Sequence, residues 1–233
     1  MTTKPVHQHG GRRQRKKEQF LKYGIETLPD HEVLEILLYY AIPRSDTNDI
    51  AHTLIKKFGS LNNVLDAEYD ELKNVSGIGD NAASLICFFR LLSRVYTRNS
   101  AEKELIENFN CERLKDYCNT LFFGSKSEEI YCLYLTDDLK LICEERVSMG
   151  TIGKVDLPIR KIAHSALVNK CSRLVISHNH PAGSCMPSRA DIDATKDVCD
   201  MFKKMDVELI DHIIVGRDGV ASLKESGYMT GYW

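Results

Sequence analysis

Two histidines and an aspartate carry the clearest chemistry in this sequence. His178 and His180 follow the short apolar run 174–176, which reads as the end of a buried strand. Residues i and i+2 of an extended chain point the same way, so both imidazoles can reach one ion. Ser188 stands where a helix N-cap belongs, which places Asp191 in the first turn of a helix that can fold back toward the histidines. Two imidazoles and one carboxylate leave one tetrahedral position open, as in a catalytic zinc site.

The spacing of these residues resembles a known metal motif. The chain reads His178-x-His180-Pro181, then six residues, then Ser188-x-x-Asp191, and this resembles the JAMM motif of the JAB/MPN metalloproteases. The segments Asn179-His180-Pro181-x-Gly183 and Pro187-Ser188 resemble the bacterial RadC family in particular. The resemblance implies a zinc-dependent hydrolase of JAMM type that cleaves an amide, isopeptide or peptide bond. It also implies one Zn²⁺ per chain, held by His178, His180 and Asp191, and a peptide or protein substrate.

Hydrolysis also needs a group that takes a proton from water and gives it to the leaving group. In the JAMM family this group is a glutamate at the start of an early strand. Glu128 and Glu129 open such a strand here, and we expect Glu129 to fill the role. The resemblance gives Ser188 a hydrogen bond to the substrate oxyanion, beside its place as a helix cap. Asn179 and Lys161 depart from the commoner residues of related sequences, and Asn179 argues against a ubiquitin-type substrate.

Other interpretations of the same residues stay open. The two histidines alone could be ordinary residues near a strand end. The chain could be a DNA-binding accessory protein of repair or recombination, whose MPN half is a metal-bound scaffold. It could also be a metal-dependent nuclease, although one zinc ion with a single carboxylate ligand suits two-metal phosphodiester chemistry poorly.

The C-terminal half, residues 101–233, must position this motif. Strands are predicted over residues 130–135, 140–147, 173–177, 207–215 and 220–223, with helices after residue 158 and over 191–204. The alternation of strands and helices predicts an α/β domain. The resemblance implies a mixed sheet of MPN/JAB type, which is cytidine-deaminase-like, with flanking helices. His212 lies in the fourth strand, and we expect a core or surface histidine there rather than a partner of the metal ligands.

Residues 18–100 are predicted to form an all-α domain. Gly77-Ile78-Gly79 stands just before a helix expected from Ala82 to about Arg98, and it resembles the turn of helix-hairpin-helix DNA-binding modules. Such a turn lets a phosphate approach the amides at a helix N-terminus. A tight turn that binds nothing is the alternative, because Asp80 follows the second glycine and Lys73 is the one nearby cation of the hairpin.

Residues 1–17 are polar and basic, and they include Arg12 and Arg13. We expect a disordered, solvated arm, with a phosphate-contacting arm as the alternative. Gly77, Gly79, Arg12 and Arg13 are therefore the candidates for contact with duplex or branched DNA. The formal net charge of −2 gives no general attraction to nucleic acid, so any basic surface must be local.

The composition is that of an ordinary globular protein, with 43% hydrophobic and 27% charged residues. No apolar run approaches the roughly 20 residues of a membrane helix, and the N-terminus has no apolar core of a secretory signal. With neither feature, we expect no membrane partner and a cytoplasmic location. None of the eight cysteines forms a Cys-x-x-Cys pair, so a structural zinc ribbon is not expected. Most of them sit among apolar neighbours, and we expect buried, reduced thiols. Cys185, inside the metal loop, is expected to be a loop residue and not a ligand.

Overall fold

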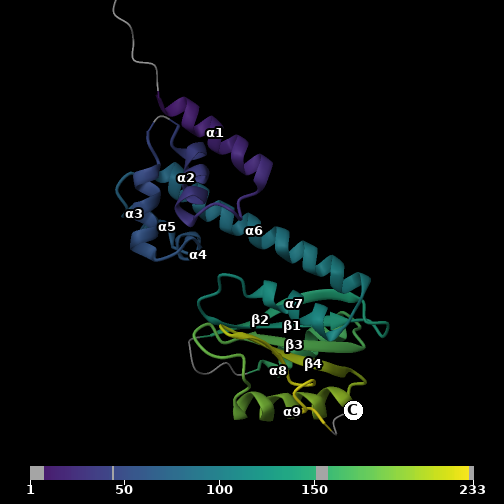
Figure 1. Cartoon of the computed structure of the whole chain (residues 1–233). Coiled ribbons are helices and arrows are strands. Elements are labelled where there is room, and N and C mark those ends of the chain that lie inside the picture. The colour runs from purple at the N-terminus through teal and green to yellow at the C-terminus, as the bar shows by residue number, and fades with distance from the viewer. Residues whose placement is uncertain (1–7, 44, 151–156, 231–233) are drawn as a thin grey trace, which may run out of the picture. The chain divides into compact units, whose positions relative to one another are not determined.

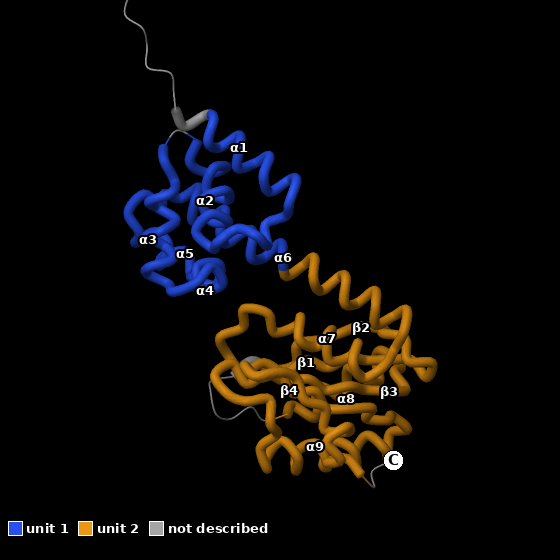
Figure 2. The backbone as a smooth tube through the Cα atoms, in the orientation of Figure 1, with its two compact units in different colours: residues 1–93 blue, residues 94–233 orange. Residues whose placement is uncertain are grey.

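The structure, a computed structural model, describes residues 8–43, 45–150 and 157–230 of the chain (Figure 1). The chain divides into two compact units, residues 1–93 and 94–233 (Figure 2). The described part of the first unit is helical, and the second unit contains the sheet. The predicted class, a helical region followed by an α/β domain with a mixed sheet, is confirmed.

The first unit is a small helical bundle with one large apolar core and a second, smaller buried cluster. Its helices are α1 (Gln8–Tyr23), α2 (Asp30–Ala41), α3 (Asn48–Phe58), α4 (Leu61–Leu65), α5 (Tyr69–Lys73) and the beginning of α6 (Asp80–Glu107). Leu34 and Leu38 of α2, Leu54 of α3, Leu72 of α5 and Ile86 of α6 are fully buried together. Their helical spacing in the sequence produces this core, because each helix turns one apolar stripe inward.

The basic segment expected to be a solvated arm is largely helical, and that expectation was wrong for residues 8–17. These residues form the first part of α1, while residues 1–7 lie outside the described part of the chain. Arg13 donates hydrogen bonds to the carbonyl oxygens of Ile42 at 2.7 Å, Pro43 at 2.9 Å and Ser45 at 2.5 Å. The guanidinium therefore takes up carbonyls left without partners after the end of α2, and this ties α1 to the bundle.

Helix α6 is longer than the sequence indicates. We expected a helix to about Arg98 and a domain boundary near Ser100, whereas α6 continues without a break to Glu107. The division between the two compact units falls inside this helix, between Ser93 and Arg94. Residues 99–107 carry many charges, but they include neither Gly nor Pro, and residues 101–107 are mostly good helix formers, so nothing in this segment ends the helix.

The second unit is built on a five-stranded mixed sheet in the order β2-β1-β3-β4-β5. The strands are β1 (Glu128–Leu135), β2 (Leu141–Gly150), β3 (Arg173–Asn179), β4 (Glu208–Gly216) and β5 (Gly219–Ser222). Only the central β3–β4 pair among these is parallel. Helix α7 (Cys111–Leu121) covers one face, and α8 (Ile159–Val168) and α9 (Arg189–Lys203) cover the other (Figure 1).

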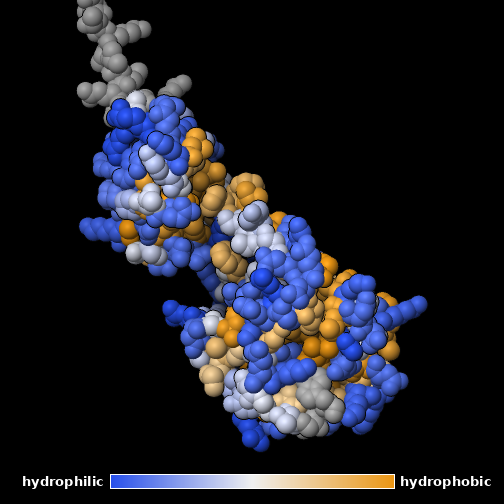
Figure 3. Space-filling view, turned by 45° about the vertical axis from the view of Figure 1, so that its right-hand side comes forward, coloured by the Kyte–Doolittle hydropathy of each residue, from blue (hydrophilic) through white to orange (hydrophobic). Residues whose placement is uncertain are grey.

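The face shown in Figure 3 carries hydrophilic and apolar side chains side by side. Helix α6 carries several exposed apolar side chains, namely Phe88, Leu91, Leu92, Val95 and Tyr96. None of the helices in the described ranges is long and apolar enough to cross a membrane.

Candidate metal centre

The two histidines lie at the C-terminal end of β3. His178 pairs with Ile130 of β1 on one side and with Ile214 of β4 on the other. It therefore lies in the middle of the sheet, and its ring is buried on one face. His180 follows the strand, and its main-chain N–H donates to the carbonyl of Val215 at 2.8 Å. This bond continues the parallel pairing of β3 and β4 by one residue. It keeps the His180 side chain beside His178, as the alternation of an extended chain predicts.

Asp191 comes to the histidines from the first turn of α9. Ser188 is the N-cap of this helix, and the two residues form a capping box: Ser188 Oγ accepts from the Asp191 N–H at 3.2 Å, and Asp191 Oδ2 accepts from the Ser188 N–H at 2.7 Å. The predicted cap is therefore present. The reciprocal bonds fix the Asp191 side chain and leave Oδ1 directed toward His178 at 3.3 Å.

His178, His180 and Asp191 form one group of possible metal ligands, with one ligand atom of each lying within 4.8 Å of the others. The two Nε2 atoms are 3.0 Å apart, and His180 Nε2 is 3.7 Å from Asp191 Oδ2. Their side chains are between about a tenth and a fifth exposed. The structure thus brings all three predicted ligands together between the end of β3 and the first turn of α9.

The hydrogen bonds of the two imidazoles leave both Nε2 atoms directed toward one point. Burial lowers the pKa of His178 to about 4, so this ring is neutral near pH 7. His180 Nδ1 lies 2.7 Å from the carbonyl oxygen of Ser184, and because a carbonyl only accepts, Nδ1–H donates there and Nε2 is turned toward His178. The two Nε2 atoms face each other at 3.0 Å, where both could ligate one cation.

His212 lies against the candidate ligands, which the sequence did not lead us to expect. Its Nε2 is 2.8 Å from His178 Nδ1, and its Nδ1 is 2.6 Å from the hydroxyl of Thr195 on α9. His212 is only 2% exposed, so the expectation of a core histidine is confirmed. The expectation that it would not contact a ligand was wrong, because it contacts His178. The signal in the sequence is the polar pair Asp211-His212 inside an otherwise apolar strand.

The loop between His180 and Met186 is held by the β4–β5 hairpin. Arg217 donates its main-chain N–H to the carbonyl of Gly183 at 2.9 Å. Asp218 accepts from the Ser184 hydroxyl at 2.6 Å and from the Cys185 N–H at 2.8 Å. These hydrogen bonds lower the pKa of Asp218 to about 2. Cys185 thus contributes its backbone to the loop, and it is not in the group of possible ligands.

Glu129 is buried at the ligand end of β1. Its main-chain N–H donates to Asn179 Oδ1 at 2.7 Å, and its carboxylate lies 3.4 Å from Arg146 of β2. The antiparallel pairing of Ile130 with His178 puts those two side chains on one face, so alternation directs Glu128 to that face and Glu129 to the face covered by α7. Lys161, at the start of α8, pairs with Glu145 at 3.1 Å.

The candidate DNA contacts of the first unit are engaged within the chain. Gly77 has φ +89°, and a Cβ there would lie 2.8 Å from Ile50, so this glycine is needed for a close turn. Lys73 forms an ion pair with Asp80, which also accepts from the Tyr69 hydroxyl at 2.7 Å. A carboxylate therefore already occupies the first turn of α6, where a phosphate would bind, and it neutralises the nearby cation.

Of the two remaining candidates for DNA contact, Gly79 lies in an open position and Arg12 is paired with a carboxylate. A Cβ on Gly79 would meet no atom within 4 Å, so its place in the hairpin is open. Arg12 lies 3.2 Å from Glu35, which is buried and also accepts from the Tyr39 hydroxyl at 2.6 Å. Arg12 therefore neutralises a buried charge, a role that does not need nucleic acid.

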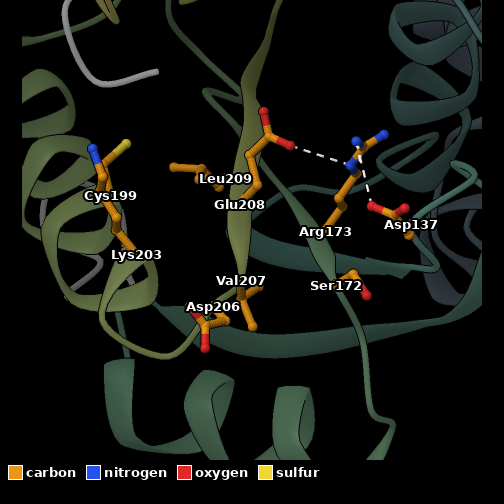
Figure 4. Close-up of a pocket in the computed structure, with 9 residues that line it drawn as sticks. All are labelled: Asp137, Ser172, Arg173, Cys199, Lys203, Asp206, Val207, Glu208 and Leu209. Carbon is orange, nitrogen blue, oxygen red and sulfur yellow. Dashed lines mark ion pairs between the residues drawn. The ribbon is translucent and has the colours of Figure 1, made fainter.

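The second unit has one cavity beside the candidate metal ligands and a larger one away from them. A cavity of about 190 Å³ borders His180 and is lined also by Asn179, Phe123 and Arg217. A larger cavity of about 510 Å³ lies at the opposite end of β3 and β4 (Figure 4). There Arg173 is bound by Glu208 at 3.2 Å and by Asp137 at 3.5 Å, and no candidate ligand lines the cavity.

The fold and the group of three ligand residues are those of a JAB/MPN domain that follows a helical region. Residues 109–228 match the RadC-like JAB domain, and residues 9–84 match the family described as UPF0758 N-terminal. A UPF0758 protein of Ruegeria pomeroyi is 32% identical over 221 residues, and one of Fusobacterium nucleatum is 33% identical over 226 residues. Each comparison covers 93% of this chain and 96% of the relative. The chain belongs to the RadC family.

Proposed function

We propose that this chain is a zinc-dependent hydrolase that cleaves an amide bond, of a peptide or an isopeptide, at His178, His180 and Asp191. The observation that carries the proposal is that the Nε2 atoms of the two histidines face each other 3.0 Å apart, with Asp191 Oδ1 3.3 Å from His178 Nε2. Two imidazole nitrogens and one carboxylate oxygen that converge at a partly exposed site are a suitable set of ligands for one cation. The match to a domain of JAB type supports the same assignment.

A bound zinc ion would polarise the substrate carbonyl and lower the pKa of a water molecule toward neutrality. His178 and His180 would hold it through Nε2, and Asp191 through Oδ1, because Oδ2 accepts from the Ser188 N–H. The Ser188 hydroxyl accepts from the Asp191 N–H, so its own hydrogen is available to donate to the oxygen of the substrate carbonyl.

A carboxylate at the start of β1 would accept the proton from water and pass it to the leaving nitrogen. Glu129, the residue predicted from the sequence, is buried at the ligand end of the sheet, but alternation turns its side chain to the face covered by α7, away from His178. Glu128 is the adjacent carboxylate on the face of His178, so we assign the step to Glu128 and use Glu129 as the matched comparison.

The first test is the metal content of the purified protein by elemental mass spectrometry. The wild type is compared with a His178→Ala/His180→Ala double variant and with His164→Ala, which removes an exposed histidine of α8. We expect about one zinc per chain in the wild type and in His164→Ala, and none in the double variant. Absence of zinc from the wild type after zinc has been supplied would overturn the proposal.

The second test separates chemistry from metal binding. Zinc-loaded wild type, Glu129→Gln and Glu128→Gln are incubated with a library of peptides and isopeptides, and cleavage is followed by mass spectrometry. We expect Glu128→Gln to keep its zinc and to lose cleavage by at least 100-fold, the usual contribution of a general base, and Glu129→Gln to cleave within a few-fold of the wild type. Loss of cleavage in Glu129→Gln alone would move the base to Glu129, and a zinc-loaded wild type that cleaves nothing in the library would count against hydrolysis.

A further inference from the structure

A buried chain of hydrogen bonds connects two of the candidate ligands behind the centre. It starts at the main-chain carbonyl of Asp191, passes through the Thr195 hydroxyl and both nitrogens of His212, and ends at His178 Nδ1. Thr195 is 1% exposed and His212 2% exposed, so water does not compete for these bonds. We call Thr195 and His212 the relay.

The direction of every bond in the relay follows from its first member. The Asp191 carbonyl can only accept, and it lies 2.6 Å from Thr195 Oγ1, so the single hydroxyl hydrogen of Thr195 is used there. Thr195 Oγ1 must then accept from His212 Nδ1–H at 2.6 Å. With its hydrogen on Nδ1, the neutral ring of His212 has an acceptor at Nε2.

The last bond decides which nitrogen of His178 can bind a metal. His212 Nε2 accepts from His178 Nδ1–H at 2.8 Å, and a neutral imidazole with its hydrogen on Nδ1 keeps a lone pair on Nε2. We propose that Thr195 and His212 are positioning residues that set the tautomer and orientation of His178, so that its Nε2 is ready to ligate. This inference rests on the proposed metal centre, although the tautomer itself is set without a metal.

The Ser184 carbonyl does the same for His180 from the other side, through Nδ1 at 2.7 Å. The two ligands are thus prepared by different means, one by a loop carbonyl and one by a side-chain relay in the core. Only the relay can be broken by changing a side chain without touching a ligand or its loop. Thr195→Val removes the hydroxyl at nearly constant volume, and Thr195→Ser keeps it.

The test measures the tautomer and the zinc affinity separately. Nitrogen-15 NMR of the metal-free protein near pH 8, about where an ordinary imidazole is neutral, reports which nitrogen of His178 carries the hydrogen. We expect Nδ1–H in the wild type and in Thr195→Ser. In Thr195→Val the His212 Nδ1–H has no acceptor, so His212 should carry its hydrogen on Nε2, donate to His178 Nδ1 and shift the His178 hydrogen to Nε2.

Competition with a zinc chelator then gives the affinity of each variant. We expect Thr195→Val to bind zinc about 10- to 100-fold more weakly than the wild type, and Thr195→Ser to bind within a few-fold of it. A wild-type His178 with its hydrogen on Nε2, or unchanged tautomer and affinity in Thr195→Val, would overturn the relay. A wild type with the expected tautomer and no zinc affinity would instead overturn the proposed function and leave the relay standing.

Discussion

The side-chain oxygen of Asn179 accepts a hydrogen bond from the main-chain N–H of Glu129 at 2.7 Å. The nitrogen of the same side chain donates to the Ser127 carbonyl at 3.0 Å. Asn179 stands between the two histidines in the sequence, so one carboxamide fastens the start of β1 to the end of β3. The residue therefore fixes the glutamate segment relative to the ligands, and this accounts for an amide at a position that the sequence only marked as a departure.

Replacement of Asn179 by Ala should leave the buried main-chain N–H of Glu129 without its partner and remove one of the two donors to the Ser127 carbonyl, which keeps the Ser125 hydroxyl. We expect a loss of about 2 kcal/mol in the free energy of unfolding, because an unsatisfied buried group costs about 1–3 kcal/mol. Zinc content should stay near that of the wild type, since no ligand is changed. Urea unfolding with parallel metal analysis measures both. The control is Asn62→Ala at an exposed position of α4, and equal stability of the two variants would show that the Asn179 bonds contribute nothing.

Gly216 at the end of β4 allows the metal loop to lie against the strand. A Cβ at this position would be 2.1 Å from Cys185 N and 2.5 Å from the Ser184 carbonyl carbon, both backbone atoms that cannot turn aside. Gly216→Ala should therefore displace the loop that carries His180 and weaken zinc binding by about tenfold or more. Gly79→Ala, where a Cβ would meet nothing within 4 Å, is the matched control in the same chelator titration. Wild-type affinity in Gly216→Ala would contradict this account of the loop.

Most of the local structure around the centre could be read from the sequence because short-range patterns determine it. The apolar run before His178 predicts β3, and Ser188 three residues before Asp191 predicts the capped start of α9. The relay could not be predicted in this way. Thr195 and His212 come from different elements, and a histidine in an apolar strand has no periodic signal that distinguishes a core residue from a partner of a ligand.

The basic N-terminal segment was misread for a related reason. A run of Arg and Lys with few apolar residues resembles a solvated arm, and the partners of Arg13 are main-chain carbonyls, which no side-chain pattern reveals. The face of the sheet on which Glu129 lies could not be predicted from the sequence either. Sequence places a glutamate at the start of a strand, but the register against β3 decides the face, and register depends on pairing across the sheet.

Arg13 should matter for stability more than its neighbour Arg15 on the same helix. Arg13→Ala removes the hydrogen bonds to the carbonyls after α2, whereas Arg15 is exposed. We expect Arg13→Ala to lower the local free energy of unfolding of α1 and α2 by about 2 kcal/mol, the usual size for hydrogen bonds from a charged donor. Hydrogen exchange of the amides in these helices measures it. Arg13→Ala that exchanges like Arg15→Ala would show that the segment behaves as the solvated arm first expected.

The pH dependence of the metal loop should follow Asp218. Hydrogen bonds from Ser184 and Cys185 lower the pKa of Asp218 to about 2, below the ordinary value of 3.8. The carboxylate is thus favoured in the folded protein, so its contribution is complete above pH 3.8 and is lost as the pH falls toward 2. The stability difference between wild type and Asp218→Ala, measured by urea unfolding of the metal-free proteins, should be constant from neutral pH to about pH 4 and then shrink. For Asp200→Ala, on the exposed face of α9, the stability difference from the wild type should not shrink below pH 4. A difference for Asp218→Ala that grows toward low pH would have the wrong sign for a carboxylate that tethers the loop.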